Sequence, residues 1–213
     1  MRELVEGVDI HENNKSRLNL PERRLAKIFV FRLIYGGQAY SYAHDSNFNS
    51  ISKSVNYWQG LIDEFYEKYQ GIAKWHETLV RTVLDSGRLV MPTGRTYLWD
   101  RGDVVRNLWR HRPKILNYPV QGLGADLVAI GRVTIWRRLR AAGIPHLFIS
   151  TVHDSLDIDC ETCYTSSICS NIKSSFEDVP KNFQRLFGVP FDLPINSEIG
   201  YGLNIAELTP YKG

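Results

Sequence analysis

A run of four side chains, spaced four residues apart, is the feature that most restricts how this chain can fold. The run lies in PERRLAKIFVFRLIYGG, and its spaced positions are Arg23, Lys27, Phe31 and Tyr35. On an α-helix a step of four residues advances about 40° beyond a full turn, so these side chains share one slowly drifting face. Pro21 suits the first turn of such a helix, and Gly36-Gly37 suits its end. The segment therefore predicts a helix with a chemically ordered face.

The order of side chains on this face is two cations followed by two aromatic rings. Arginine and lysine bind phosphate as a planar fork and a point charge respectively. A flat ring beside them offers a base or a sugar a surface for stacking. The face therefore predicts a site for a nucleoside triphosphate lying along the helix. The alternative interpretation is an ordinary amphipathic helix with a basic side.

The spacing R-x3-K-x3-F-x3-YG resembles the nucleotide-binding fingers helix of the family A DNA polymerases. The resemblance implies that Arg23 and Lys27 hold the triphosphate, and that Lys27 also neutralises or helps protonate the departing pyrophosphate. It implies that Phe31 packs near the sugar and that Tyr35 borders the template base. The segment VDIH resembles the stretch that leads toward this helix and makes His11 a phosphate contact, unless it is a surface histidine.

A second motif, TVHDS at residues 151–155, resembles the catalytic motif of the same family. Residues 147–152 are apolar and β-branched and residues 156–160 alternate, so a hairpin with Asp154 at its tip is predicted. A carboxylate there is a hard oxygen ligand that suits Mg²⁺, whereas a solvated turn is the alternative. The resemblance makes Asp154 the metal ligand and catalytic carboxylate, and it gives His153 the support of the primer terminus.

A third motif, NYPVQGLGAD at residues 117–126, resembles the family's N-x3-Q-G stretch. In this interpretation Asn117 and Gln121 face the minor groove of the primer–template, where amides reach acceptors shared by all base pairs. The alternative is a helix N-terminus with capping polar groups. Arg112 belongs to a basic cluster just before this motif, and we expect it to contact DNA phosphates.

The resemblance extends over most of the chain and implies an α+β fold. The segment DSGRLVMPTGRTYLW, residues 85–99, resembles the fingers hairpin, and SEIGYGLN, residues 197–204, resembles the closing palm strand. Residues 1–105 are expected to form a helical fingers subdomain. Residues 106–213 are expected to form part of a palm with an antiparallel sheet.

Spacing and turn residues predict further elements between these motifs. Two helices are expected on either side of Gly71, and a long helix is expected over residues 122–142. Thr162 is expected to cap a helix that reaches about Asp178. A stretch punctuated by proline then leads to a last strand at residues 195–201.

Length and charge set broad limits on the function. The chain has 213 residues and a net charge of +3, which permits nucleic-acid binding without requiring it. This length is enough for one large domain or two small ones. The sequence contains no apolar run of about 18 residues, so no membrane span is expected. We expect a cytoplasmic location, in a host cell if the protein is viral.

Two-metal nucleotidyl transfer requires more than this chain is expected to supply. The two ions lie about 4 Å apart and need at least two carboxylates, of which Asp154 is one. The family's other metal aspartate lies upstream of the segment that VDIH resembles. We therefore expect a split or fragmentary polymerase, in which a second polypeptide or an N-terminal segment supplies that aspartate, the thumb and any exonuclease. The expected partners of such an enzyme are primer–template DNA and dNTP, with Mg²⁺ as the cofactor.

Two alternative functions remain open from the sequence. Ser155 after His-Asp is typical of the related single-subunit RNA polymerases, whereas Phe31 is the choice of the DNA enzymes. A non-catalytic subunit that binds primer–template or nucleotide is the second alternative. A change of Asp154 separates this binding subunit from an enzyme, and competition between ribo- and deoxyribonucleotides separates RNA from DNA synthesis.

Overall fold

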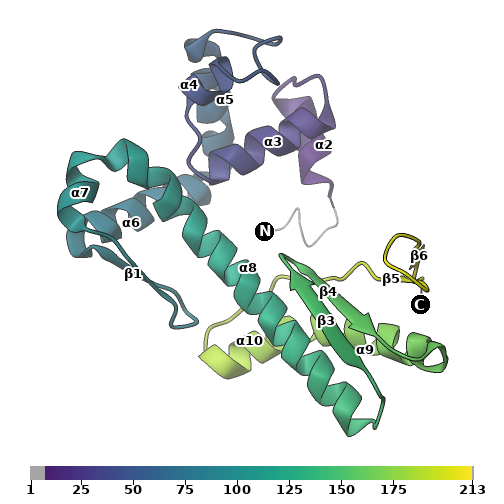
Figure 1. Ribbon diagram of the computed structural model, residues 1–213. Helices are drawn as coiled ribbons and strands as arrows, with labels where there is room; N and C mark the ends of the chain where they lie inside the picture. Colours follow the sequence, from purple (N-terminus) through teal and green to yellow (C-terminus); the bar gives the residue numbers. More distant parts are fainter. Residues whose placement is uncertain (1–7, 213) are drawn as a thin grey trace. The chain divides into compact units, whose positions relative to one another are not determined.

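The computed structural model describes residues 8–212, which form two compact units (Figure 1). The first unit is Met1–Gln121 and the second is Gly122–Gly213. This boundary falls inside a long helix and differs from the position near residue 105 that separates the expected fingers and palm subdomains. The division into these subdomains stays a prediction. None of the helices in the described range has the length and apolar character needed to cross a membrane.

The first unit is mainly helical and contains one small hairpin. Its helices and strands are α2 (Ile10–Arg17), α3 (Arg23–Ile34), α4 (Ala39–Ala43), α5 (Val55–Lys68), α6 (Gln70–Ser86), β1 (Arg88–Val90), β2 (Thr96–Leu98), α7 (Arg101–Arg106) and the beginning of α8 (Leu108–Ala141). Strands β1 and β2 pair antiparallel, which confirms the hairpin expected over residues 85–99.

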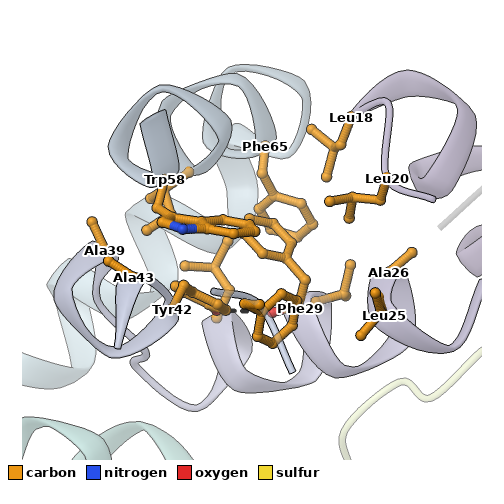
Figure 2. Close-up of a cluster of buried hydrophobic side chains, with 14 residues drawn as sticks. Leu18, Leu20, Leu25, Ala26, Phe29, Ala39, Tyr42, Ala43, Trp58 and Phe65 are labelled. Carbon is orange, nitrogen blue, oxygen red and sulfur yellow. Dashed lines mark hydrogen bonds between the residues drawn. The ribbon is translucent and has the colours of Figure 1, made fainter. Parts of the chain in front are cut away.

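The core of the first unit explains why α3 exposes its basic and aromatic face. The opposite face of α3 buries Phe29, which lies against Tyr42 with ring centroids 4.8 Å apart. Tyr42 stacks on Trp58 of α5 and donates a hydrogen bond of 2.9 Å to the Phe29 carbonyl oxygen (Figure 2). Large aromatic rings contribute much of the apolar area removed from water in such a core. Burial of one face thus fixes which side chains of α3 meet solvent.

Both ends of α3 refine the expectation from the sequence. The helix begins at Arg23 with Glu22 as its N-cap, so Pro21 precedes the helix and does not lie in its first turn. At the other end Gly36 adopts φ 87°, in the left-handed region that favours glycine. A Cβ atom on Gly36 would also lie 3.0 Å from Leu116 Cδ1 of α8. Gly36 is therefore required both for the turn and for the close approach of α8.

Two helix boundaries differ from those predicted. Helices α5 and α6 separate at Tyr69, and Gly71 lies inside α6, where an exposed glycine is tolerated at a modest cost. Helix α8 begins at Leu108 instead of residue 122, although it contains Pro113 and Pro119. Each proline removes one hydrogen bond within the helix. Complete burial of the neighbouring Ile115 and Leu116 stabilises the helical conformation there.

The second unit packs helices against an antiparallel hairpin. Besides the end of α8 it contains β3 (Leu147–Val152), β4 (Ser155–Asp159), the 3₁₀ helix η1 (Thr162–Tyr164), α9 (Thr165–Glu177), α10 (Val179–Phe187), β5 (Gly200–Tyr201) and β6 (Thr209–Pro210). Its core joins Ile135 and Leu139 of α8 to Phe183 of α10. At Gly131 a Cβ atom would lie 2.7 Å from the Phe176 ring, so α8 and α9 pack closely at this point. The hairpin β3–β4 confirms the predicted hairpin, and the unit as a whole confirms the α+β class.

Three predicted elements of the second unit were wrong in detail. Thr162 lies in η1 and does not cap α9, which begins at Thr165 without a side-chain cap. The stretch punctuated by proline, for which no helix was predicted, contains α10, whose first turn accommodates Pro180 and whose end is marked by Gly188 at φ 68°. The expected last strand shortens to β5, which pairs antiparallel with β6.

Candidate functional site

Helix α3 presents the predicted nucleotide-binding face to solvent. Arg23, Lys27 and Phe31 are exposed, and Tyr35 is half-buried at the C-cap. The Lys27 ammonium lies 5.8 Å from the centroid of the Phe31 ring, and the rings of Phe31 and Tyr35 are 6.2 Å apart. The order of cations followed by rings is therefore present in space as it is in the sequence.

The beginning of α2 lies beside this face. Asp9 caps α2, with Oδ1 accepting hydrogen bonds from the His11 and Glu12 backbone N–H groups at 3.0 and 3.1 Å. Its other carboxylate oxygen, Oδ2, accepts a 2.8 Å hydrogen bond from Arg23 Nε. The His11 ring lies 5.6 Å from the Phe31 ring. The structure thus brings His11 beside the exposed face of α3, and its phosphate contact stays a prediction.

Asp9 is a member of this cluster that the sequence analysis missed. Its role as a helix cap is signalled by its position just before the start of a polar helix. Its contact with Arg23, on another helix, has no comparable signal in the sequence.

Charge on this face alters the pKa values of the groups around it. The Arg23 guanidinium lowers the pKa of Asp9 to about 2, and Asp9 in turn raises the pKa of Arg23. Burial, followed by the charge of Arg23, lowers the pKa of His11, and Lys27 adds to this lowering against the opposing effect of Asp9. His11 Nδ1 is buried and has no hydrogen-bond partner among the described residues. At neutral pH the imidazole is therefore uncharged beside two cations.

A hydrogen bond between side chains joins two of the three motifs. Gln121 Nε2 of α8 donates to Tyr35 Oη at 3.0 Å, although the two residues are 86 positions apart. Asn117 lies one helical turn before Gln121, so the two amides share a side of α8. Asn117 Oδ1 is buried and, within residues 8–212, no donor reaches it. The structure therefore places the end of α3 and the N-x3-Q-G stretch at one location.

Arg112 lies behind the end of α3 instead of projecting freely from α8. Its Nη1 atom donates a long hydrogen bond of 3.5 Å to the Gly36 carbonyl oxygen. Burial raises the pKa of Tyr66, and the nearby Arg112 opposes that change. Tyr66 Oη is 3.1 Å from His76 Nδ1, and His76 is only 2% exposed. A phosphate contact by Arg112 stays a prediction, whereas its contact with the end of α3 is a finding.

Tyr66 and His76 were missed because their sequence context gives a helical pattern and no more. Burial, and then the positive charge of Arg112, lower the pKa of His76 to about 4, and the Ile34 carbonyl only partly opposes this. The last carbonyls of a helix lack partners within the helix. The cluster of Tyr66, His76 and Arg112 therefore supports the end of α3, next to Tyr35.

In the second unit the His-Asp motif forms the tip of the hairpin. His153 and Asp154 make the two-residue turn between the paired residues Val152 and Ser155, and both are exposed. His153 adopts φ 54°, a conformation uncommon for residues other than glycine. Ser155 Oγ donates a 2.9 Å hydrogen bond to the Val152 carbonyl oxygen, which closes the turn. The turn thus holds the Asp154 carboxylate in solvent.

The hairpin tip offers one carboxylate, that of Asp154, as a possible ligand of a magnesium ion. Mg²⁺ is commonly held by one or two carboxylates together with phosphate oxygens and water. Asp157 instead accepts a short hydrogen bond from Ser150 Oγ on the neighbouring strand. Among the described residues no group of three or more histidine, cysteine or acidic side chains is arranged to hold a metal. Asp154 is the carboxylate at the exposed tip of this hairpin, and its role as a metal ligand stays a prediction.

The fold has a counterpart among solved polymerases. It superposes on the structure titled POL domain of Pol1 from M. smegmatis, in complex with DNA primer-template and dNTP, with a TM-score of 0.76 and 18% sequence identity. The match covers 92% of this chain and 34% of that one. The fold is therefore that of part of a polymerase domain.

Sequence comparisons identify the family. The model of DNA polymerase family A matches residues 2–207. The DNA polymerase of Bacillus phage SP01 is 25% identical over 94% of this chain, and DNA polymerase I of Aquifex aeolicus is 25% identical over 89%. This chain belongs to DNA polymerase family A. It spans 21% of the phage relative's length and 33% of the Aquifex relative's length.

Proposed function

We propose that this chain takes part in template-directed DNA synthesis, the transfer of a nucleotidyl group from dNTP to a primer 3′-hydroxyl. The observation that carries the proposal is the shared location of the four spaced α3 side chains and Gln121, joined by the 3.0 Å hydrogen bond to Tyr35. Membership of the family and the order of the three motifs along the chain support it.

On the nucleotide side, Arg23 and Lys27 would bind the triphosphate. Arg23 already pairs with Asp9, whereas Lys27 forms no ion pair within the described range and is the more available cation. Lys27 would neutralise the leaving pyrophosphate, where negative charge increases as the bond to the α-phosphorus breaks. His11 would donate a hydrogen bond from its ring N–H to a phosphate oxygen at the same face. Phe31 and Tyr35 would shape the pocket for the nascent base pair.

On the DNA side, the amides of Asn117 and Gln121 would face the end of the primer–template. Amides suit this role because the minor groove presents acceptors common to all base pairs. Arg112 would add a phosphate contact, and His153 would support the primer terminus. Rotation of α3 on binding the correct nucleotide would select against mismatches before chemistry.

Family A DNA polymerases generally use Mg²⁺, and Asp154 is the residue proposed to hold it here. When bound, the ions lower the pKa of the 3′-hydroxyl and stabilise the charge of the pyrophosphate. The 3′-oxygen forms a bond to the α-phosphorus as the bond to pyrophosphate breaks, and the hydroxyl proton leaves to solvent. Asp154 contributes one carboxylate to this centre.

The proposed centre includes a second carboxylate, together with a thumb, from elsewhere. Its source would be a second polypeptide or a further segment of a longer chain. The chain matches only 21% and 33% of the lengths of these two relatives, which is compatible with either source. The proposed location of the assembled enzyme is the cytoplasm, in a host cell if the protein is viral.

Primer extension by material purified from the native source tests the proposal. The polypeptides that travel with this chain are identified by mass, and extension of a labelled primer is measured in the same fractions with dNTP and with rNTP. The proposal predicts extension with dNTP only, in the fractions that contain this chain. Preferential incorporation of rNTP would assign RNA synthesis instead. DNA binding without extension in every fraction would assign a binding subunit.

A further inference from the structure

The hairpin of β1 and β2 follows α6 in the first unit (Figure 1). Leu89 of β1 belongs to a buried apolar cluster that also contains Leu116 of α8, and Tyr97 of β2 packs against this cluster. At the base of the hairpin the Trp99 N–H donates a 2.8 Å hydrogen bond to the Gly87 carbonyl oxygen, at the end of α6. The hairpin is therefore held in place by apolar packing and by a backbone hydrogen bond.

One side chain of this hairpin is bonded directly to the backbone of α8. Tyr97 Oη donates a 2.8 Å hydrogen bond to the Tyr118 carbonyl oxygen, 21 residues further along the chain. The centroids of the Tyr97 and Tyr118 rings are 5.7 Å apart, and the Trp99 ring lies nearly parallel to that of Tyr118 at 6.2 Å. Tyr97 thus contacts α8 both through its hydroxyl group and through its ring.

The bonded carbonyl lies in the part of α8 that carries the amides proposed to face DNA. Asn117 directly precedes Tyr118, and Gln121 follows Tyr118 by three residues, so these side chains project from neighbouring turns of the helix. Pro119 lies between the two amides and has no N–H, so α8 has one hydrogen bond fewer here than a regular helix. The hydrogen bond from Tyr97 stabilises the backbone at this weakened place.

The contact between the hairpin and α8 does not involve α3. Gln121 also donates a hydrogen bond to Tyr35 at the end of α3, but α3 is the helix proposed to rotate when nucleotide binds. A contact with a rotating helix cannot by itself keep α8 in one position. Rotation of α3 would leave the hydrogen bond from Tyr97 in place, so Tyr97 is the better placed of the two tyrosines to fix α8.

We infer that Tyr97 is a positioning residue for the recognition of the primer end. Its hydroxyl group fixes the α8 backbone at Tyr118, and this backbone determines where the Asn117 and Gln121 amides meet the minor groove. In this role the hydroxyl group contacts neither DNA nor nucleotide. The inference rests on the proposed DNA synthesis and adds to it a residue of the β1–β2 hairpin.

Extension of matched and mismatched primer ends by the assembled polymerase tests the inference. Tyr97→Phe removes the hydroxyl group and keeps the ring. A mismatched end does not present its minor-groove acceptors in the regular geometry, so the variant should slow extension of matched ends and leave extension of mismatched ends nearly unchanged. We expect the ratio of the two kcat/KM values to fall about fivefold, the effect of losing one neutral hydrogen bond.

Two further comparisons separate positioning from a general structural role. In a protein that already carries Asn117→Ala and Gln121→Ala, addition of Tyr97→Phe should lower the ratio no further, because the hydroxyl group acts through these amides. Tyr57→Phe removes the hydroxyl group of an exposed tyrosine on α5 and should leave the ratio unchanged. Circular dichroism and urea denaturation of each variant establish that it is folded under the assay conditions.

Two results would overturn the inference and leave the proposed function standing. The first is a ratio that Tyr97→Phe does not change, in an enzyme that extends matched primers with dNTP. The second is an equal fall of the ratio in the protein that lacks both amides, because the effect would then not pass through them. Absence of dNTP extension by the unchanged protein would contradict the proposed function and, with it, the inference.

Discussion

At the exposed face of α3, charge determines what each residue can contribute. Arg23 is held by Asp9, and the paired carboxylate keeps this cation in one place at the start of the helix. Among the described residues, Lys27 contacts the Phe31 ring and forms no ion pair. His11 is kept neutral by burial and by the two cations. The three groups are therefore not equivalent, although the sequence predicted a phosphate contact for each of them.

The pKa of His11 should rise when a triphosphate binds to this face. The negative charges of the phosphates would offset the cations that now lower it, and an opposite charge nearby commonly raises a histidine pKa by about one unit or more. NMR titration of the His11 ring with and without dNTP measures the change. An unchanged or lowered His11 pKa would count against phosphate binding here.

At the level of elements, the end of α3 depends on contacts that the sequence does not reveal. Gly36 permits the turn, Arg112 reaches its carbonyl oxygen, and Tyr66 and His76 lie behind it. These contacts come from helices α5, α6 and α8. They hold Tyr35 where Gln121 can reach it.

Acid should destabilise the fold through His76. Its pKa is 6.5 in the unfolded chain and about 4 in the folded protein, so the unfolded state takes up the proton first as the pH falls. Stability is therefore lost from about pH 6.5 downward and levels off near pH 4. The contribution lost between pH 7 and pH 5 is about 2 kcal/mol.

Urea denaturation at both pH values measures this effect. His76→Gln keeps a hydrogen-bonding group for Tyr66 but cannot titrate, so its loss of stability should be smaller than that of the unchanged protein by about that amount. The contribution of carboxylates to the pH dependence is the same in both proteins, so it cancels in the difference between them. An identical pH dependence in the two proteins would contradict the assignment.

Substitution of Gly36 should lower the free energy of unfolding by more than substitution of another glycine in the same conformation. Gly36→Ala places a methyl group 3.0 Å from Leu116 Cδ1 at φ 87°. Gly94→Ala has a similar φ of 83° with nothing within 4 Å, so it measures the backbone cost alone, roughly 1 kcal/mol. We expect Gly36→Ala to destabilise the protein by about 1 kcal/mol more in thermal or urea unfolding. Equal losses of stability in the two variants would show that α8 moves away from the added methyl group without destabilising the protein.

For the whole molecule, the sequence predicted elements and motifs better than their boundaries and contacts. The α3 face and the β3–β4 hairpin follow from local periodicity, and both are confirmed. Helix α10 was not predicted within the stretch punctuated by proline, although a proline is tolerated in the first turn of a helix. The start of α8 was missed for a similar reason, since Pro113 and Pro119 lie inside it.

The contacts that support α3 could not be predicted from the sequence, for a different reason. The pairing of Asp9 with Arg23 and the cluster of Tyr66, His76 and Arg112 depend on how helices pack. Local spacing along one helix carries no information about its neighbours. Each of the three motifs lies within one short continuous segment and could therefore be identified from the sequence. The residues of these contacts are far apart in the sequence.

The most direct test of the account is the effect of Asp154→Ala on the assembled polymerase, compared with Asp159→Ala on the same hairpin. Single-turnover incorporation of dNTP and primer–template affinity are measured for both variants. We predict that Asp154→Ala lowers the incorporation rate by at least about a thousandfold, because a metal-ligand carboxylate stabilises several kcal/mol of charge in the transition state. DNA affinity should barely change, and Asp159→Ala should retain most of the activity. Incorporation by the Asp154 variant at the rate of the Asp159 variant would contradict the catalytic role assigned to this chain.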